Sequence, residues 1–165
     1  MIRAWRLTRR THAVPSSAAF SGRGAELNGG RWNAVGTPAA YGSASAALAA
    51  LEYLVHVDPE ELPADLVFAE VSFDEVDVES CTPPPGWRES GSETAVTFGE
   101  AWLHEQRSLV LAVPSAVIAF EMNYVFNPAH DRAGTLTVAE NLIDFIFDDR
   151  LLPLSGRQEH PRQGP

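Results

Sequence analysis

The chain has 165 residues, of which 45% are hydrophobic, and this length fits one domain with a substantial core better than two. Its formal net charge of −10 argues against general nucleic-acid binding, because that function needs basic surface to displace counterions. The single cysteine, Cys81, excludes an intramolecular disulfide. No apolar run of signal-peptide type follows the basic N-terminus, and no stretch approaches the roughly 18–20 apolar residues of a membrane span, so we expect a soluble, cytoplasmic protein without a membrane segment.

All 12 basic residues are arginine, which holds phosphate through paired hydrogen bonds as lysine does not. A GC-rich genome explains such a bias equally well. The acidic balance is explained by solubility alone, or by a basic protein partner. An acidic protein that acts on an anion must place its few cations at the site, so the position of each arginine matters.

The N-terminal half contains alternating strand and helix signals. Two segments predict strands at its beginning and end, residues 2–7 and 65–73. Between them, residues 8–30 form a long Gly-containing loop and residues 38–41 a short strand. The Ala- and Leu-rich run at 44–57 is apolar nearly all round, which predicts a buried helix that ends before Pro59.

The C-terminal half begins with a turn-rich connection over residues 82–93. Its predicted elements are a helix over 93–106 capped by Ser92, a buried strand over 109–113, and strands over 117–126 and 139–147, with a helix over 139–150 as the alternative to the last. These elements predict one α+β domain, residues 1–153, around a central antiparallel or mixed sheet. Residues 154–165 are polar and Pro/Gly-rich, which predicts a flexible tail.

Glu52 lies inside the most apolar predicted helix of the chain. It shares one helical stripe with Ser45, Ala49 and His56, at spacings of 4, 3 and 4 residues. Because an unpaired buried carboxylate is costly, this side chain lies either at the edge of a cleft or in a salt bridge. Composition alone favours neither position.

Two further residues have the chemistry of a ligand site. Arg31 directly follows Gly29-Gly30, where paired glycines permit close backbone approach and the guanidinium can clamp a diphosphate. The alternative is an ordinary turn with a surface arginine. Tyr41, just ahead of the Glu52 helix, can stack on a flat ring and offer its hydroxyl, although a core tyrosine is the commoner role.

Ser115 follows the strand at 109–113 but has no G-x-S-x-G motif, so it is a weak candidate nucleophile and a turn serine is the alternative. Asn127, in an Asn-Pro turn, either holds loop backbone or contacts a ligand. The five histidines lack metal-ligand spacing, so we expect no metal site.

Taken together, these segments resemble the RES domain family, named for an arginine, a glutamate and a serine. The matching segments stand in the family's order: Trp5-Arg6, Phe20-Ser21-Gly22, Gly29-Gly30-Arg31-Trp32-Asn33, Gly36-Thr37-Pro38, Tyr41, Ala47-Leu48-Ala49-Ala50-Leu51-Glu52 leading to His56, Leu111-Ala112-Val113-Pro114-Ser115, Glu121, Asn123, Asn127-Pro128 and Asp149-Arg150-Leu151. They span roughly residues 3–130, with the last tripeptide beyond.

The resemblance implies a fold related to ADP-ribosyltransferases, with NAD+ as substrate and no resident cofactor. It implies that Arg31, Tyr41, Glu52 and Ser115 line the site, and we add Asn127 as an NAD+ contact. It also implies a toxin of a type II toxin–antitoxin system, whose Xre-type helix-turn-helix antitoxin covers the cleft in a hetero-oligomer. Family members deplete NAD+ by hydrolysis or phosphorolysis, and some modify a protein target such as phosphoribosylpyrophosphate synthetase.

The candidate residues suit cleavage of the nicotinamide–ribose bond, which passes through an oxocarbenium-like state. Glu52 supplies the carboxylate that stabilises positive charge, Arg31 the cation for the phosphates, and Tyr41 a flat partner for nicotinamide. Ser115 is then a polar positioning group. Transfer of ADP-ribose to a macromolecule and a non-catalytic binding module that keeps only the fold are the competing hypotheses.

Overall fold

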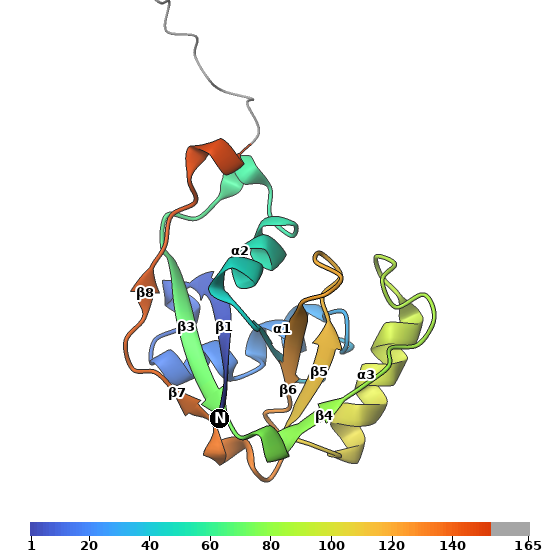
Figure 1. Ribbon diagram of the computed structural model, residues 1–165. Coiled ribbons are helices and arrows are strands. Elements are labelled where there is room, and N and C mark those ends of the chain that lie inside the picture. Colours follow the sequence, from blue (N-terminus) through green and yellow to red (C-terminus); the bar gives the residue numbers. More distant parts are fainter. Residues whose placement is uncertain (153–165) are drawn as a thin grey trace, which may run out of the picture.

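A curled eight-stranded sheet runs through the computed structural model, which describes residues 1–152 (Figure 1). The strands are β1 (Ile2–Arg9), β2 (Ala40–Ser43), β3 (Leu66–Phe73), β4 (Val78–Ser80), β5 (Val110–Pro114), β6 (Met122–Phe126), β7 (Thr137–Val138) and β8 (Ile143–Asp144). Their order is β4-β5-β6-β2-β1-β3-β7, and β8 also pairs with β3. Among the strands of residues 1–152, only β4 and β5 pair in parallel, so the predicted α+β fold with a mixed sheet is confirmed.

The sheet is nearly divided between β1 and β2. Strand β1 pairs with β3 along its whole length, from Ile2 to Arg9. Its pairing with β2 is a single one, Trp5 with Ser43. Because the two strands diverge on either side of this pair, backbone and side chains of both strands are left facing an opening. In Figure 1, β3 and β1 lie on one side of the molecule, and β6, β5 and β4 lie on the other.

Three α-helices of the described residues accompany the sheet: α1 (Arg23–Asn28), α2 (Ala46–Leu54) and α3 (Glu93–Glu105). The predicted cap of α3 is confirmed, since the Ser92 side chain accepts a hydrogen bond from the N–H of Ala95. The core has three parts. Phe20, Phe73 and Phe126 anchor one part, Trp32 and Trp102 lie in the part beside α3, and Leu7 and Phe68 lie under α2.

The helix predicted over 44–57 is shorter and less buried than expected. Ser45 is its N-cap, and the helical residues end at Leu54. Leu48 and Ala49 are buried, but Leu51 and Val55 expose 37% and 58% of their surface. The prediction of a buried helix was wrong because α2 packs through one face only. Alanine is small enough to occupy either face, so composition did not reveal which side packs.

The long loop predicted over residues 8–30 is also wrong in detail. It contains two 3-10 helices, Arg10–His12 and Ser16–Phe20, before α1 begins at Arg23. These turns have only three and five residues, so they are too short to carry a hydrophobic periodicity. The first residues of the short strand were also misplaced, because pairing of β2 with β6 begins at Ala40.

Two strand predictions near the C-terminus were too long. In the segment 117–126, only Met122–Phe126 form a strand, because the chain turns just after Ser115. In the segment 139–147, only Ile143–Asp144 pair, and no α-helix forms over 139–150. The short edge strands β4 and β7 were not predicted. The predicted flexible tail, residues 154–165, lies outside the described residues, and the domain boundary at 153 stays a prediction.

Within residues 1–152, no helix combines the length and the hydropathy that crossing a bilayer requires.

Gly99 sets the distance between α3 and the segment that carries Arg31. A Cβ at this position would overlap the backbone carbonyl of Trp32. We predict that Gly99→Ala lowers the free energy of unfolding by about 3 kcal/mol, because backbone cannot yield as a flexible side chain does. Urea denaturation measures this. Gly134→Ala is the control, since no atom lies within 4 Å of its added Cβ. Equal stability of the two variants would contradict the packing.

Candidate active site

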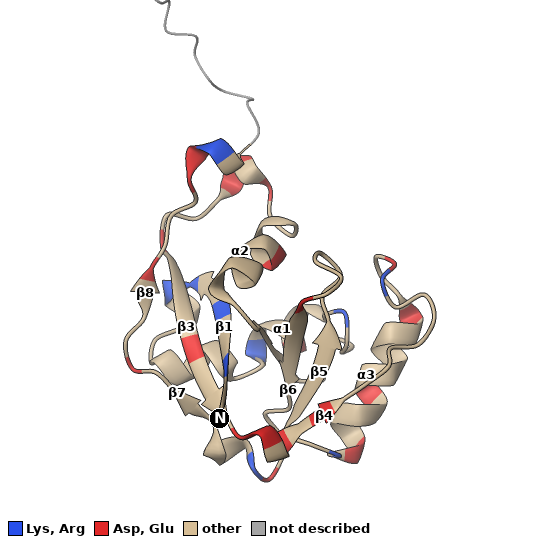
Figure 2. Cartoon of the chain, viewed as in Figure 1, with Lys and Arg blue, Asp and Glu red and all other residues tan. Residues whose placement is uncertain are grey.

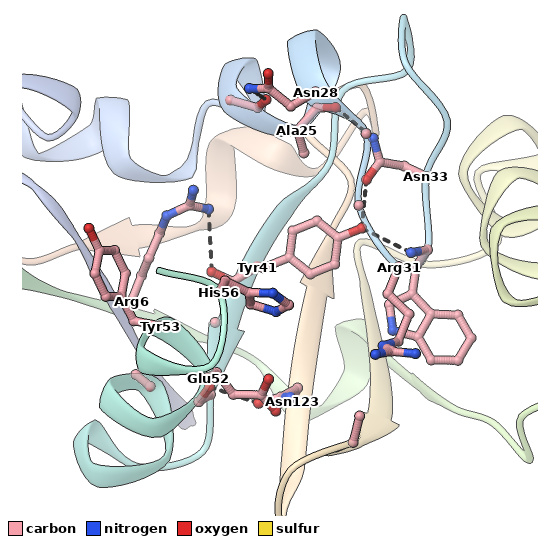
Figure 3. Close-up of a pocket in the computed structure, with 18 of the residues that line it drawn as sticks. Arg6, Ala25, Asn28, Arg31, Asn33, Tyr41, Glu52, Tyr53, His56 and Asn123 are labelled. Atoms are coloured by element: carbon pink, nitrogen blue, oxygen red, sulfur yellow. Dashed lines mark hydrogen bonds between the residues drawn. The ribbon is translucent and has the colours of Figure 1, made fainter. Parts of the chain in front are cut away.

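A cavity of about 780 Å³ opens where β1 and β2 diverge. Its wall comes from β1, β2, α2, the segment from Gly29 to Val35, and a turn at 90–92. A volume of this order is typical of small-molecule and cofactor sites, which span roughly 300–1,000 Å³. Figure 3 shows Arg6 of β1, Arg31 of the loop after α1, Tyr41 of β2, Glu52 of α2 and Asn123 of β6 converging on it.

Glu52 lies on α2 with its carboxylate held from one side. Its Oε1 accepts hydrogen bonds from Ser115 Oγ at 2.6 Å and from Asn123 Nδ2 at 2.5 Å. Asn123 is oriented in turn, because its Oδ1 accepts a bond of 2.7 Å from Ser43 Oγ. Within residues 1–152, Oε2 has no hydrogen-bond donor, so one oxygen is fixed and the other is left for the cavity that Glu52 lines. The edge-of-cleft alternative for Glu52 is the one observed.

Ser115 is fully buried behind this carboxylate. Its Oγ accepts the backbone N–H groups of Val117 and Ile118, at 3.0 and 2.9 Å, while it donates to Glu52. The hydroxyl therefore closes a turn and orients the carboxylate at once. The structure brings Ser115 and Glu52 together, and it places Ser115 as a positioning residue behind the cavity wall.

Tyr41 lines the cavity from β2, but its hydroxyl is already engaged. It donates to Asn33 Oδ1 at 2.6 Å and accepts from the Trp32 N–H at 3.2 Å. A side chain at Gly30 would collide with this hydroxyl, which explains the second glycine of the pair. Burial raises the pKa of Tyr41 well above its ordinary value of 10.0. The ring face is what remains for a ligand.

Arg31 lines the cavity opposite α2 and is tied to the turn that follows Pro85. Its Nη1 donates to the carbonyls of Trp87 and Glu89, at 2.7 and 3.1 Å. The guanidinium also lies 6.0 Å from the centre of the Trp87 ring, which itself stacks on Trp32. Arg31 is therefore not a free surface arginine, because its Nη1 is hydrogen-bonded to two carbonyls. Its other N–H groups remain available to bind a ligand.

Asn127 is not brought to the cavity. It is buried at the end of β6, where its Nδ2 donates to the Leu103 carbonyl and its Oδ1 accepts the Ala129 N–H. Of the two predicted roles, Asn127 therefore has that of holding loop backbone. The structure does not support an NAD+ contact for this residue. Asn123, four residues earlier on β6, takes the position at the site.

Three arginines of the described chain form no ion pair with Asp or Glu. The others all form ion pairs, namely Arg3, Arg9, Arg10, Arg23, Arg107, Arg132 and Arg150. Arg6, Arg31 and Arg88 form none within residues 1–152. Arg6 and Arg31 line the cavity, and Arg88 reaches the Ser115 carbonyl at 3.5 Å. In Figure 2, acidic positions are spread over β3, β4 and α3, while basic positions interrupt β1.

Sequence reasoning singled out Glu52, Arg31, Tyr41 and Ser115, and it missed Ser43. Ser43 lies two residues beyond Tyr41, and the spacing of alternate strand residues on one face was the available signal. Within residues 1–152 no group of three or more His, Cys, Asp or Glu side chains is arranged to hold a metal ion. The expectations of no metal and no resident cofactor stay predictions.

The fold and the cavity have solved and curated counterparts. The toxin–antitoxin complex MbcT–MbcA of M. tuberculosis contains a chain that superposes with a TM-score of 0.62, at 21% identity over 87% of this chain and 84% of that one. The RES domain family matches residues 3–148, and this chain belongs to the RES domain toxin family.

Curated relatives agree with this family. The "Prs ADP-ribosylating toxin" of Sphingobium sp. (strain YBL2) is 37% identical over 140 residues, covering 81% of this chain and 86% of the relative. The "Toxin Res" of Photorhabdus laumondii is 36% identical over 153 residues, covering 90% of this chain and 96% of the relative. The resemblance inferred from the ordered motifs is thereby confirmed.

The raised pKa of Tyr41 predicts a pH dependence of stability. Because the folded pKa lies above the ordinary value, the contribution of Tyr41 is intact below pH 10.0 and is lost as pH rises toward the folded value. In urea titrations above pH 10.0, Tyr41→Phe should therefore lose stability less steeply than the parent, by up to about 1.4 kcal/mol per pH unit. Parallel slopes for the two proteins would show that Tyr41 ionises normally.

Proposed function

We propose that this chain is a toxin that binds NAD+ in the cavity and breaks its nicotinamide–ribose bond. The observation that supports this most is the Glu52 carboxylate, held at one oxygen by Ser115 and Asn123 and facing a dinucleotide-sized cavity. Arg6 and Arg31, both without a carboxylate partner in the described chain, line the same cavity. The two phosphates of NAD+ are an anion that this pair of guanidinium groups suits.

Glu52 acts on the ribose in this proposal. The bond from ribose C1′ to the nicotinamide nitrogen breaks with its electron pair leaving on nicotinamide, and positive charge develops on the ribose. The Oε2 oxygen of Glu52 stabilises that charge, or holds a ribose hydroxyl. Because Ser115 and Asn123 fix the carboxylate before the reaction, little reorganisation is needed as charge develops.

The remaining cavity residues bind and orient. The ring face of Tyr41 stacks on nicotinamide, since its hydroxyl is engaged by Asn33. Arg31 uses its free N–H groups for a phosphate. The acceptor completes the reaction: an oxygen of water or phosphate forms the new bond to C1′ and releases its proton to solvent. Hydrolysis then gives ADP-ribose, and phosphorolysis gives its 1-phosphate.

We predict that Glu52→Gln lowers kcat for nicotinamide release by about 10²–10³-fold, because the amide keeps the shape but loses the charge that the transition state needs. The measurement is proton NMR of NAD+ incubated with purified protein, with and without inorganic phosphate, which identifies both the broken bond and the acceptor. Glu61→Gln, an exposed change of the same kind, is the control. Full turnover by folded Glu52→Gln would remove Glu52 from the chemistry.

Transfer of ADP-ribose to a protein is a second candidate, favoured by the 37% identity to a relative named for ADP-ribosylation. Here a nucleophilic side chain of the target replaces water at C1′. Mass spectrometry of cell protein after induction should then show ADP-ribose on one target, such as phosphoribosylpyrophosphate synthetase. Purified toxin alone should consume NAD+ slowly. Rapid consumption without any protein acceptor favours the first candidate.

An antitoxin partner forms part of the proposal. The solved MbcT chain was crystallised in a toxin–antitoxin complex, which supports a similar pair here, formed in the cytoplasm with an Xre-type helix-turn-helix protein over the cavity. Val35, which lines the cavity and exposes 69% of its surface, offers apolar area for such a cover, as do Leu51 on α2 and Val55, the C-cap of α2. Co-expression should restore growth and suppress nicotinamide release.

A further inference from the structure

The carboxylate of Glu100, on α3, binds the segment that carries Arg31. Its Oε1 accepts the backbone N–H of Ala34 at 2.9 Å, and its Oε2 accepts the hydroxyl of Thr37, also at 2.9 Å. The Glu100 side chain exposes 22% of its surface, and the exposed His104 lies 3.2 Å from Oε2. Both oxygens are thus bound in a half-buried place, where a hydrogen bond is stronger than in water.

The two contacts of Glu100 span a single turn. Ala34 and Thr37 are its first and last residues, since the Thr37 N–H donates to the Ala34 carbonyl at 3.2 Å. Gly36 has a φ of +96° within it, which favours glycine at that position. Asn33 holds the turn from the other side, because its Nδ2 donates to the carbonyls of Ala34 and Thr37. The Gly36-Thr37 motif therefore has a role: the glycine permits the turn, and the threonine binds Glu100.

This turn is coupled closely to Arg31. Gly30 and Asn33 pair across a tight bend, where the Gly30 N–H donates to the Asn33 carbonyl at 2.9 Å, and Arg31 lies within that bend. The residue that follows the bend is Ala34, which Glu100 holds. A shift of Ala34 therefore moves the bend, and the Arg31 guanidinium moves with it.

The charge of Glu100 and its hydrogen bonds have opposite effects on an anionic substrate. Burial is the main reason that the pKa of Tyr41 is raised, and the Glu100 carboxylate is among the smaller causes, so its charge acts on the cavity. A negative charge at this distance repels an anion. The hydrogen bonds favour the anion instead, because they hold the segment of Arg31. Substitution can separate the two effects.

We propose that Glu100 is a positioning residue for substrate binding, which holds the turn at 34–37 so that Arg31 meets the diphosphate of NAD+. The proposal rests on the proposed function for the identity of the substrate. Glu100 is not among the residues that line the cavity, so it acts through Arg31. The alternative is that Glu100 supports the fold alone. Its removal then lowers stability and leaves the KM of the folded protein unchanged.

The test measures KM and kcat for nicotinamide release in Glu100→Ala and Glu100→Gln. Glutamine loses the charge but keeps an oxygen for the Ala34 N–H and an amide group that donates to the Thr37 hydroxyl. We expect Glu100→Ala to raise KM for NAD+ on the order of 10-fold, with a smaller change in kcat. Glu100→Gln should keep KM at or below that of the parent. Glu105→Ala is the control, since this exposed glutamate of the same helix pairs with Arg107 and should leave KM unchanged.

A second measurement shows whether Glu100 acts through Arg31. In an Arg31→Ala background, Glu100→Ala should change KM by less than about 2-fold, because the group that Glu100 positions is gone. An equal rise in KM with and without Arg31 overturns the proposal. An unchanged KM in Glu100→Ala, or a rise in Glu100→Gln as large as in Glu100→Ala, also overturns it.

Thermal denaturation shows whether each variant is folded. If Glu100→Ala is not, Thr37→Val replaces it, since valine keeps the shape but removes one of the two hydrogen bonds, and its KM should rise by a smaller factor. Failure of the proposed function is distinguished by calorimetry with NAD+. NAD+ that binds to the parent more tightly than to Glu100→Ala, and stays intact, overturns only the proposed cleavage. Absence of NAD+ binding to the parent overturns both proposals.

Discussion

The pairing of Trp5 with Ser43 is the constraint on which the site depends. It joins two halves of one sheet at a single point, whereas β1 is paired to β3 along eight positions. Strands that pair fully leave no room between them, because neighbouring strands lie about 4.8 Å apart. Divergence around one pair opens the cavity and frees the backbone of Tyr41 on that side. Arg6 directly follows Trp5, Tyr41 lies two residues before Ser43, and both line the opening.

Charge distribution follows from the same geometry. A chain of net charge −10 repels anionic substrates unless its cations are concentrated where substrate binds. Most of its arginines are neutralised locally by Asp or Glu, and exposed pairs of this kind add little to stability. Those at the cavity are held by backbone carbonyls and by the Trp87 ring instead. Such partners orient a guanidinium while leaving its charge available.

The sequence predicted which residues lie at the site better than it predicted the hydrogen bonds that hold them. Glu52 was recognisable because a carboxylate stood in an apolar helix, and Arg31 because it followed a glycine pair. Strands β1 and β3 were predicted to within two residues of their ends, and β3 carried the stronger signal because most of its residues are apolar. Asn127 and Asn123 look equivalent in the sequence. They differ in role because Asn123 lies on β6, whereas Asn127 follows the last residue of that strand. Short edge strands and 3-10 turns are decided by tertiary contacts, which no local pattern encodes.

The orientation of Glu52 shows why its partners had to come from distant segments. An unsupported glutamate on a helix samples several rotamers. Its side chain must be held in one of them before its carboxylate can stabilise charge at one place. Ser115 reaches it from the turn after β5, and Asn123 from β6, itself held by Ser43 of β2. Since β5, β6 and β2 are adjacent in the sheet, the donors keep a fixed spacing. The sheet therefore fixes a side chain that belongs to a helix with an exposed face, and rigid support of this kind favours catalysis by preorganisation.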